Sequence, residues 1–209
     1  PRHLTAEVLA VLAGDERCCP YIDLPLQHIS DPILRAMGRG VTRRQTIELL
    51  DLVARKLPGG AIRTAFIVGY PGETEGEFQT LLDFVEELKF DRVGVFTFSF
   101  EPGTGSAALG DPVPEAMKEE RRHRLMELQQ RISLTKNQQL VGKTLQVLVE
   151  GHGDGLSLGR SYRDAPEIDG MVIIDGEVPV GEMAPVRISG AMAYDLSGTV
   201  ETAARVIAP

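Results

Sequence analysis

Ala61-Ile-Arg-Thr-Ala-Phe-Ile-Val-Gly69-Tyr-Pro-Gly72-Glu-Thr-Glu75 is the stretch that decides the fold of this chain. An apolar run of strand length stops at Gly69, turns through Tyr-Pro-Gly, and enters a helix marked by Thr74 and Glu77 at capping-box spacing. Parallel α/β folds bind small molecules at such strand ends. No lysine follows the glycines, which excludes a P-loop. An ordinary strand, turn and helix without a ligand would have the same pattern, so the motif alone leaves the function open.

The sequence around this stretch repeats the alternation of strand and helix. We expect strands at 20–25, 62–69 and 92–100, helices at 42–57, 74–89 and 114–138, and a Gly- and Pro-rich loop at 101–113. Strands that start near residues 20, 61 and 92 leave room for repeated βα crossovers, which predicts a parallel sheet.

After residue 138 the sequence pattern changes from alternating strands and helices to strands alone. Polar and apolar residues alternate at 144–150, 171–174 and 186–189, with Gly-Asp turns between them. About five short strands within roughly 70 residues predict a small closed barrel rather than a sandwich. The expected domains are therefore a partial α/β barrel at 1–113, a connecting helix at 114–138 and a β-barrel at 139–209.

Composition narrows the class of protein. Hydrophobic residues make up 43% and charged residues 25% of the chain, as in soluble globular proteins, and no apolar run approaches the ~20 residues of a membrane span. The two cysteines, Cys18 and Cys19, are adjacent in the sequence. Adjacent residues rarely satisfy disulfide geometry, which favours a reducing, cytoplasmic location. The chain begins with Pro1 rather than Met, so we expect a trimmed chain or a fragment.

Acidic residues dominate the predicted barrel. Residues 139–209 carry 5 basic and 10 acidic side chains, a net charge of −5, and residues 1–138 carry a net charge of −3. RNA binding needs a basic face, so this barrel disfavours nucleic acid and favours a basic partner. A solvated acidic surface without any partner explains the charge equally well.

Several segments carry a family resemblance. Residues 21–31 (YIDLPLQHISD), 33–40 (ILRAMGRG) and 66–74 (FIVGYPGET) resemble the later half of radical S-adenosylmethionine (SAM) methylthiotransferases, and the β-rich tail resembles their TRAM domain. Residues 90–96 (FDRVGVF) and 160–170 (RSYRDAPEIDG) resemble the ribosomal-protein branch more than the transfer-RNA branch. The resemblance implies half of a radical SAM (β/α) barrel followed by a small antiparallel all-β barrel.

The same resemblance implies an activity and its cofactors. The family adds a methylthio group, here to the β-carbon of an aspartate in the small-subunit ribosomal protein S-twelve, with SAM and two 4Fe–4S clusters. Cys18 and Cys19 do not match the family's CxxxCxxC motif. We therefore expect the clusters to be ligated outside this chain, by a missing N-terminal part of the same enzyme, and we expect the chain alone to be inactive and to hold no catalytic or metal-binding residue.

Matching positions suggest the cofactor site. The resemblance places Gln27 against the polar groups of SAM and Arg39 against its methionyl carboxylate, for which a guanidinium fork is suited. A loop-bridging amide and a surface arginine are the structural alternatives. The remaining expected cofactor contacts are the turn residues Gly69, Pro71 and Gly72, whose backbone could approach the ligand closely. For Phe96 core packing is the default expectation, and contact with the adenine of SAM is the alternative. We expect His28 to be structural rather than a catalytic base.

For the substrate, we expect the acidic loop residues Asp164, Glu167 and Asp169 to steer the basic ribosomal protein, although a solvated turn would look the same. Two alternatives stay open. One is a transfer-RNA methylthiotransferase acting on adenosine, and the other is a cluster-free adaptor that only binds a basic ribosomal protein.

Overall fold

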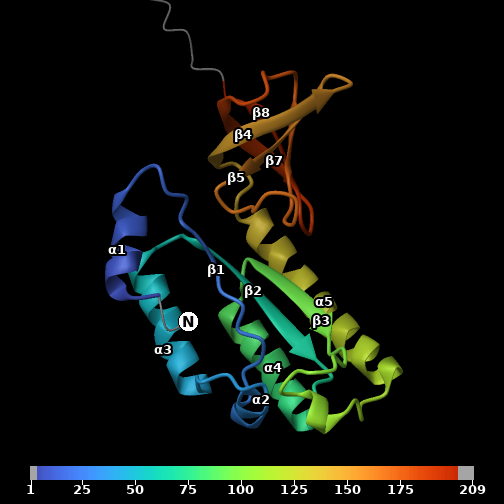
Figure 1. Cartoon of the computed structure of the whole chain (residues 1–209). Helices are drawn as coiled ribbons and strands as arrows, with labels where there is room; N and C mark the ends of the chain where they lie inside the picture. Colours follow the sequence, from blue (N-terminus) through green and yellow to red (C-terminus); the bar gives the residue numbers. More distant parts are fainter. Residues whose placement is uncertain (1–3, 202–209) are drawn as a thin grey trace, which may run out of the picture. The chain divides into compact units, whose positions relative to one another are not determined.

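The computed structural model of the chain describes residues 4–201 and divides into two compact units, Pro1–Ile132 and Ser133–Pro209 (Figure 1). Each unit has its own buried apolar core. The division falls inside the long helix α5 (Glu115–Gln138), a few residues before residue 138, where the sequence pattern changes to strands alone.

A three-stranded parallel sheet forms the centre of the first unit. Its order is β1 (Tyr21–Asp23), β2 (Ala61–Val68) and β3 (Arg92–Thr97), and both pairings are parallel as predicted. Ile22 lies opposite Ile62, and Phe66 lies opposite Val95. The carboxyl ends of the three strands therefore meet at one edge, which is the end of the sheet that carries the motif at Gly69.

Helices cover one face of this sheet. They are α1 (Ala6–Gly14), α3 (Arg43–Lys56), α4 (Glu75–Leu88) and α5. Their buried apolar residues and those of the sheet form one core, which includes Leu9, Leu50, Val53, Phe66, Val68, Phe78, Leu81, Phe84, Leu125 and Leu128. Both predicted capping boxes are present, at Thr42 with Gln45 and at Thr74 with Glu77. No helix among the described residues is long and apolar enough to cross a membrane.

Three short elements were not predicted from the sequence. Helix α1 precedes the first expected strand, α2 (Asp31–Ala36) has only six residues, and a 3₁₀ turn, η1 (Ala107–Leu109), lies inside the expected loop. Helix α1 is apolar nearly all round, so it lacks the one-sided pattern that marks an amphipathic helix. Helix α2 is too short for a periodic pattern to be recognised.

The second unit is a closed five-stranded barrel, as predicted. Its strands are β4 (Thr144–Gly153), β5 (Leu156–Ser161), β6 (Val172–Asp175), β7 (Met183–Ala191) and β8 (Leu196–Val200), in the order β4-β5-β6-β8-β7. One pair, β6 with β8, is parallel, so the expectation of a purely antiparallel barrel is wrong at that pair. The reason is that β7 pairs with β4, and β8 then fills the gap beside β6 while running in the same direction as β6.

Candidate functional site

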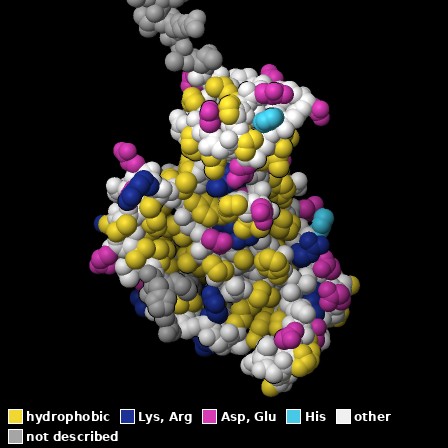
Figure 2. Space-filling view, turned by 45° about the horizontal axis from the view of Figure 1, so that its top comes forward, with side chains coloured by type: hydrophobic (Ala, Val, Ile, Leu, Met, Phe, Trp, Pro, Cys, Tyr) yellow, Lys and Arg dark blue, Asp and Glu magenta, His cyan; other side chains and the backbone are white. Residues whose placement is uncertain are grey.

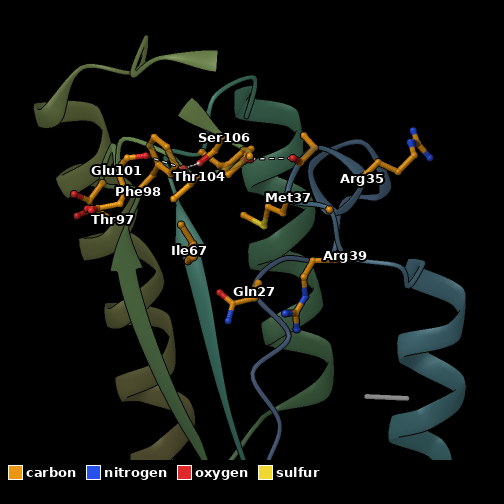
Figure 3. A pocket seen from close by; sticks show the side chains of 15 residues that line it. Gln27, Arg35, Met37, Arg39, Ile67, Thr97, Phe98, Glu101, Thr104 and Ser106 are labelled. Atoms are coloured by element: carbon orange, nitrogen blue, oxygen red, sulfur yellow. Dashed lines mark hydrogen bonds between the residues drawn. The ribbon is translucent and has the colours of Figure 1, made fainter. Parts of the chain in front are cut away.

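A cavity of about 730 Å³ opens at the carboxyl ends of the three parallel strands (Figure 3). Its walls come from the segment after β1, from α2 and the turn after it, from the end of β2, and from the end of β3 with the loop that follows. Pockets of this size and position accommodate small organic ligands in α/β folds. The strand, turn and helix at residues 61–75 therefore border a cavity, which Ile67 and Tyr70 line.

Gln27 lines this cavity because the chain extends the sheet by one bridge after β1. Its backbone N–H donates to the Ala65 carbonyl at 2.8 Å, and its carbonyl accepts from the Ile67 N–H at 2.8 Å. The residue has a φ of 71°, in the left-handed region that few non-glycine residues adopt. Both backbone groups are thus occupied by the sheet, and the side-chain amide is left for the cavity (Figure 3).

Arg39 lines the same cavity from the turn after α2. The turn closes through the Arg39 N–H, which donates to the Leu34 carbonyl at 2.8 Å, and through Gly38 at a φ of 69°. The Arg39 Nη2 donates to the Pro25 carbonyl at 2.9 Å, so the guanidinium connects the turn to the segment that carries Gln27. The structure brings these two predicted residues together, while their roles toward a cofactor stay predictions.

Aromatic and aliphatic side chains form the rest of the wall. The rings of Tyr70 and Phe98 lie edge to face with their centroids 5.0 Å apart, and the Tyr70 hydroxyl donates to the Ala36 carbonyl at 2.9 Å. Met37 and Ile67 pack against the same cluster. The cavity thus combines an apolar surface with a few polar groups, the combination typical of small-molecule sites.

The other predicted cofactor residues do not line this cavity. A Cβ added at Gly69 would lie 2.4 Å from the Lys118 Cγ, so the glycine makes room for α5 rather than for a ligand. Pro71 is buried, and Gly72 faces open space at a φ of 89°. Phe96 is 57% exposed on the sheet face and is not part of the core. A cofactor role for these four residues stays a prediction.

A buried charge cluster supports the turn between β2 and α4, and sequence reasoning missed it. The Glu73 carboxylate accepts from the Gly69 N–H, and its Oε2 lies 3.3 Å from Arg121 Nη1 of α5. The Nε2 of His28 lies 3.5 Å from the other carboxylate oxygen, and the Nδ1 of His28 accepts from the Ser30 N–H at 3.0 Å. Since Nδ1 accepts, the imidazole proton belongs on Nε2, facing the carboxylate. His28 is fully buried, which agrees with a structural role.

Lys118 lies beside this cluster and is also buried. Its ammonium donates to the Phe98 carbonyl at 3.0 Å, and it forms ion pairs with Asp111 at 2.7 Å and Glu115 at 3.1 Å. Burial opposes the charge, but the hydrogen bonds to Asp111 and Glu115 outweigh it, so the pKa of Lys118 is raised above its ordinary value. Lys118 therefore stays protonated at neutral pH.

Two of the three predicted acidic residues of the barrel loop form hydrogen bonds within the loop. Asp164 is only 5% exposed, and its carboxylate accepts from the Ser161 hydroxyl at 2.8 Å. The Asp169 carboxylate accepts from the Ala165 N–H at 2.9 Å. These two residues shape the loop, whereas Glu167 is exposed at its tip. A role in substrate recognition stays a prediction for all three residues, of which Glu167 is the most exposed.

Iron–sulfur ligands are lacking in the part of the chain that the structure describes. Residues 4–201 contain no group of three or more His, Cys, Asp or Glu side chains that could hold a metal ion. Cys18 is half-buried and Cys19 is exposed, and both are free thiols in the segment between α1 and β1. Because a 4Fe–4S cluster is usually held by four thiolates, these residues do not fit one.

Comparison with known families and proteins gives concordant results. Residues 1–85 match the radical SAM superfamily, and residues 141–200 match the TRAM domain. The chain is 51% identical over 200 residues to the "ribosomal protein uS12 methylthiotransferase RimO" of Heliobacterium modesticaldum, covering 95% of this chain and 44% of that protein. It is 52% identical over 193 residues to the protein of the same name from a strain of Thermus thermophilus, covering 91% and 44%. The chain thus spans less than half the length of these relatives.

Among solved structures, one neighbour is informative about the fold. Coproporphyrinogen III oxidase (HemN) of Escherichia coli, described as a radical SAM enzyme, superposes with a TM-score of 0.52 at 16% identity, covering 78% of this chain and 43% of that one. At this level of identity, the likeness concerns the fold alone.

Proposed function

Because the chain belongs to the radical SAM methylthiotransferase family, as a RimO-like radical SAM segment followed by a TRAM domain, we propose that it forms part of an enzyme that transfers a methylthio group to the β-carbon of an aspartate in ribosomal protein uS12. The observation that carries this proposal is the cavity at the strand ends, where Gln27 and Arg39 come together. A cytoplasmic location belongs to the same proposal, because the substrate is a ribosomal protein.

The cavity residues fit SAM. The Arg39 guanidinium is suited to the methionyl carboxylate, the Gln27 amide can donate to and accept from polar groups, and the Tyr70 and Phe98 rings offer an apolar surface to a base. In this family SAM supplies the radical chemistry once it is bound to a reduced 4Fe–4S cluster. The residues of this chain would bind and orient it.

The clusters belong to a different part of the enzyme in this proposal. The described residues offer no metal-binding group, so we propose that both 4Fe–4S clusters are ligated outside this chain. The chain alone would then be inactive. Its function is best tested in a hybrid enzyme, in which this chain replaces the matching segment of the Heliobacterium modesticaldum relative, assayed for methylthiolation of uS12 by mass spectrometry.

We expect Gln27→Ala and Arg39→Ala each to weaken SAM binding by the hybrid enzyme. Loss of a hydrogen bond to a charged group costs roughly 1.5–3 kcal/mol, or about 10- to 150-fold in affinity. Equilibrium dialysis with labelled SAM measures the effect, and iron content should stay unchanged. Arg44→Ala is the matched control, because Arg44 is an exposed arginine of α3 that pairs with Glu48 and does not line the cavity. Normal SAM affinity in both variants would remove these residues from the site.

The charge of the barrel suggests how the protein substrate is recognised. Residues 139–209 carry a net charge of −5, and acidic side chains are visible on the barrel surface (Figure 2). An acidic surface favours a basic protein such as a ribosomal protein over bare RNA. Glu167 is the loop carboxylate that is exposed and available for this purpose.

Glu167→Lys should therefore slow association of the hybrid enzyme with uS12, by roughly two- to tenfold at low salt, and the difference should shrink as salt screens the charges. Stopped-flow or surface-plasmon measurements of the association rate would show this. Glu177→Lys makes the same charge change at another exposed position of the barrel. Equal slowing in both variants would mean that only net charge matters, and no slowing in either would leave the acidic surface without a role.

A further inference from the structure

Helix α5 inserts a buried lysine behind the cavity wall. Lys118 is 1% exposed, and its ammonium donates to the backbone carbonyl of Phe98, a residue whose ring lines the cavity. The aliphatic stem of Lys118 fills the space beside Gly69, where no Cβ could fit. One side chain of α5 therefore contacts the end of β2 and the end of β3 together.

Arg121 lies one turn further along α5 and holds the next segment. Its side chain is 4% exposed, and its Nη1 donates to the Glu73 carbonyl at 3.1 Å while pairing with the Glu73 carboxylate at 3.3 Å. That carboxylate in turn accepts from the Gly69 N–H. The guanidinium carbon also lies 5.5 Å from the centre of the Phe78 ring, so the cation is enclosed on several sides.

Lys118 and Arg121 thus each donate a hydrogen bond to a backbone carbonyl in or near the cavity wall. Tyr70 lies between Gly69 and Glu73, and its ring packs against Phe98, whose carbonyl Lys118 holds. The Tyr70 hydroxyl continues the contacts to Ala36, at the start of the turn that carries Arg39. A continuous series of direct contacts therefore leads from α5 to both sides of the cavity.

Stability alone does not account for the two buried charges. Desolvation of an ammonium and a guanidinium is costly, and well-packed apolar residues are often as stabilising as a buried ion pair. What a charged side chain adds is a fixed direction, because its donors must meet particular carbonyl and carboxylate oxygens. At this place those oxygens belong to the cavity wall and to the turn behind it.

We propose that Lys118 and Arg121 are positioning residues of the cavity, which fix the ends of β2 and β3 and thereby the rings of Tyr70 and Phe98. The inference rests on the proposed function, because SAM is the ligand whose affinity reports the shape of the wall. Neither residue contacts the cavity itself.

Hydrogen exchange on the 209-residue chain tests the contact directly. Lys118→Met keeps the stem that packs on Gly69 and removes the ammonium, and it should speed exchange of the Gly69 and Phe98 amides by about tenfold or more, leaving the amides of β4 and β7 unchanged. Arg121→Met should do the same at Gly69. If the unpaired Glu73 carboxylate prevents this variant from folding, the double variant Arg121→Met with Glu73→Gln is measured in its place. Arg122→Met is the control, since Arg122 is exposed on the same helix. Unchanged exchange at Gly69 and Phe98 would overturn the proposal.

SAM affinity of the hybrid enzyme separates positioning from general stability. Lys118→Met should weaken SAM binding about tenfold, whereas Leu128→Ala, a core change on the same helix, should lower the melting temperature and leave SAM affinity unchanged. Equal loss of affinity in both variants would mean that the lysine acts only through stability, and the proposal would be wrong. If the unmodified hybrid enzyme bound no SAM, the proposed function would fail, and the exchange rates would still decide whether α5 holds the cavity wall.

Discussion

Gly69 and Gly72 lie three residues apart in one turn and share one requirement for glycine, and Gly69 has a second. Both have a positive φ, 72° and 89°. Only Gly69 is also crowded, with the Lys118 Cγ 2.4 Å from the position of an added Cβ, while Gly72 faces open space. The φ requirement is general for such turns, whereas the crowding depends on a helix that lies far along the chain.

Gly72→Ala should therefore cost about 1–2 kcal/mol of the free energy of unfolding, from backbone strain alone. Gly69→Ala should cost roughly 2–5 kcal/mol, because overpacking against Lys118 adds about 1–3 kcal/mol to the same strain. Urea unfolding of the two variants measures the difference. Equal costs would show that Lys118 moves aside without penalty.

These residues also show how far sequence reasoning reaches. Gln27 and Arg39 follow a strand and a short helix in motifs that resemble a known family, so their meeting at one cavity could be anticipated from the sequence. Lys118 and Arg121 belong to a helix rich in charged residues, which looks like a solvated surface from its composition. Their burial depends on the loop and turn that α5 packs against, and no local pattern records that packing.

At the scale of elements, α3 and α4 begin with the same capping box built from different residues. Thr42 pairs with Gln45 at the start of α3, and Thr74 pairs with Glu77 at the start of α4. The hydrogen bonds from the Thr74 hydroxyl and the Thr74 N–H lower the pKa of Glu77 below its ordinary value of 4.5. A carboxyl with a lowered pKa stabilises the fold above its unfolded pKa, and this stabilisation is lost as the pH falls through the folded pKa.

Glu77→Gln should remove the pH dependence of the capping box at α4, so that this box behaves like the one at α3. We expect the unmodified chain to lose stability relative to this variant as the pH falls below about 4.5, and the two to differ by no more than about 1 kcal/mol at pH 7. Thermal unfolding followed from about pH 3 to about pH 7 would show this. Gln45→Ala at α3 is the matched control, whose effect should not vary with pH. Parallel pH profiles for Glu77→Gln and the unmodified chain would contradict the prediction.

The same scale explains which elements could be predicted. Capping boxes and apolar stripes lie within a dozen residues of each other, so α3 and α4 are encoded locally. The direction of β8 beside β6 is set by how β7 pairs with β4, which is a long-range choice. Alternation in the sequence therefore predicted barrel strands and closure but left one strand direction wrong.

For the whole molecule, two separate cores imply two separately sensitive units. Leu81 is fully buried in the core of the first unit, and Ile174 is fully buried in the core of the barrel. Leu81→Ala and Ile174→Ala should each cost about 2–5 kcal/mol. Leu81→Ala should speed hydrogen exchange in residues 4–132, and Ile174→Ala should speed it in residues 133–201. Faster exchange throughout the chain in either variant would show that the two units unfold together.

Closure of the barrel has a consequence for how the chain is made on the ribosome. Strand β4 pairs with β7 as well as with β5, and β6 pairs with β8. The pairing of residue 144 therefore requires residue 187, and that of residue 172 requires residue 196. During synthesis the backbone edge of β4 stays unpaired until residue 187 has left the exit tunnel, and that of β6 until residue 196 has left it. Unpaired edges can join other chains. The strand-and-helix repeats of the first unit can close progressively as they emerge, because β1, β2 and β3 pair in chain order. The nascent barrel is thus the part of this chain most exposed to misassembly before translation ends.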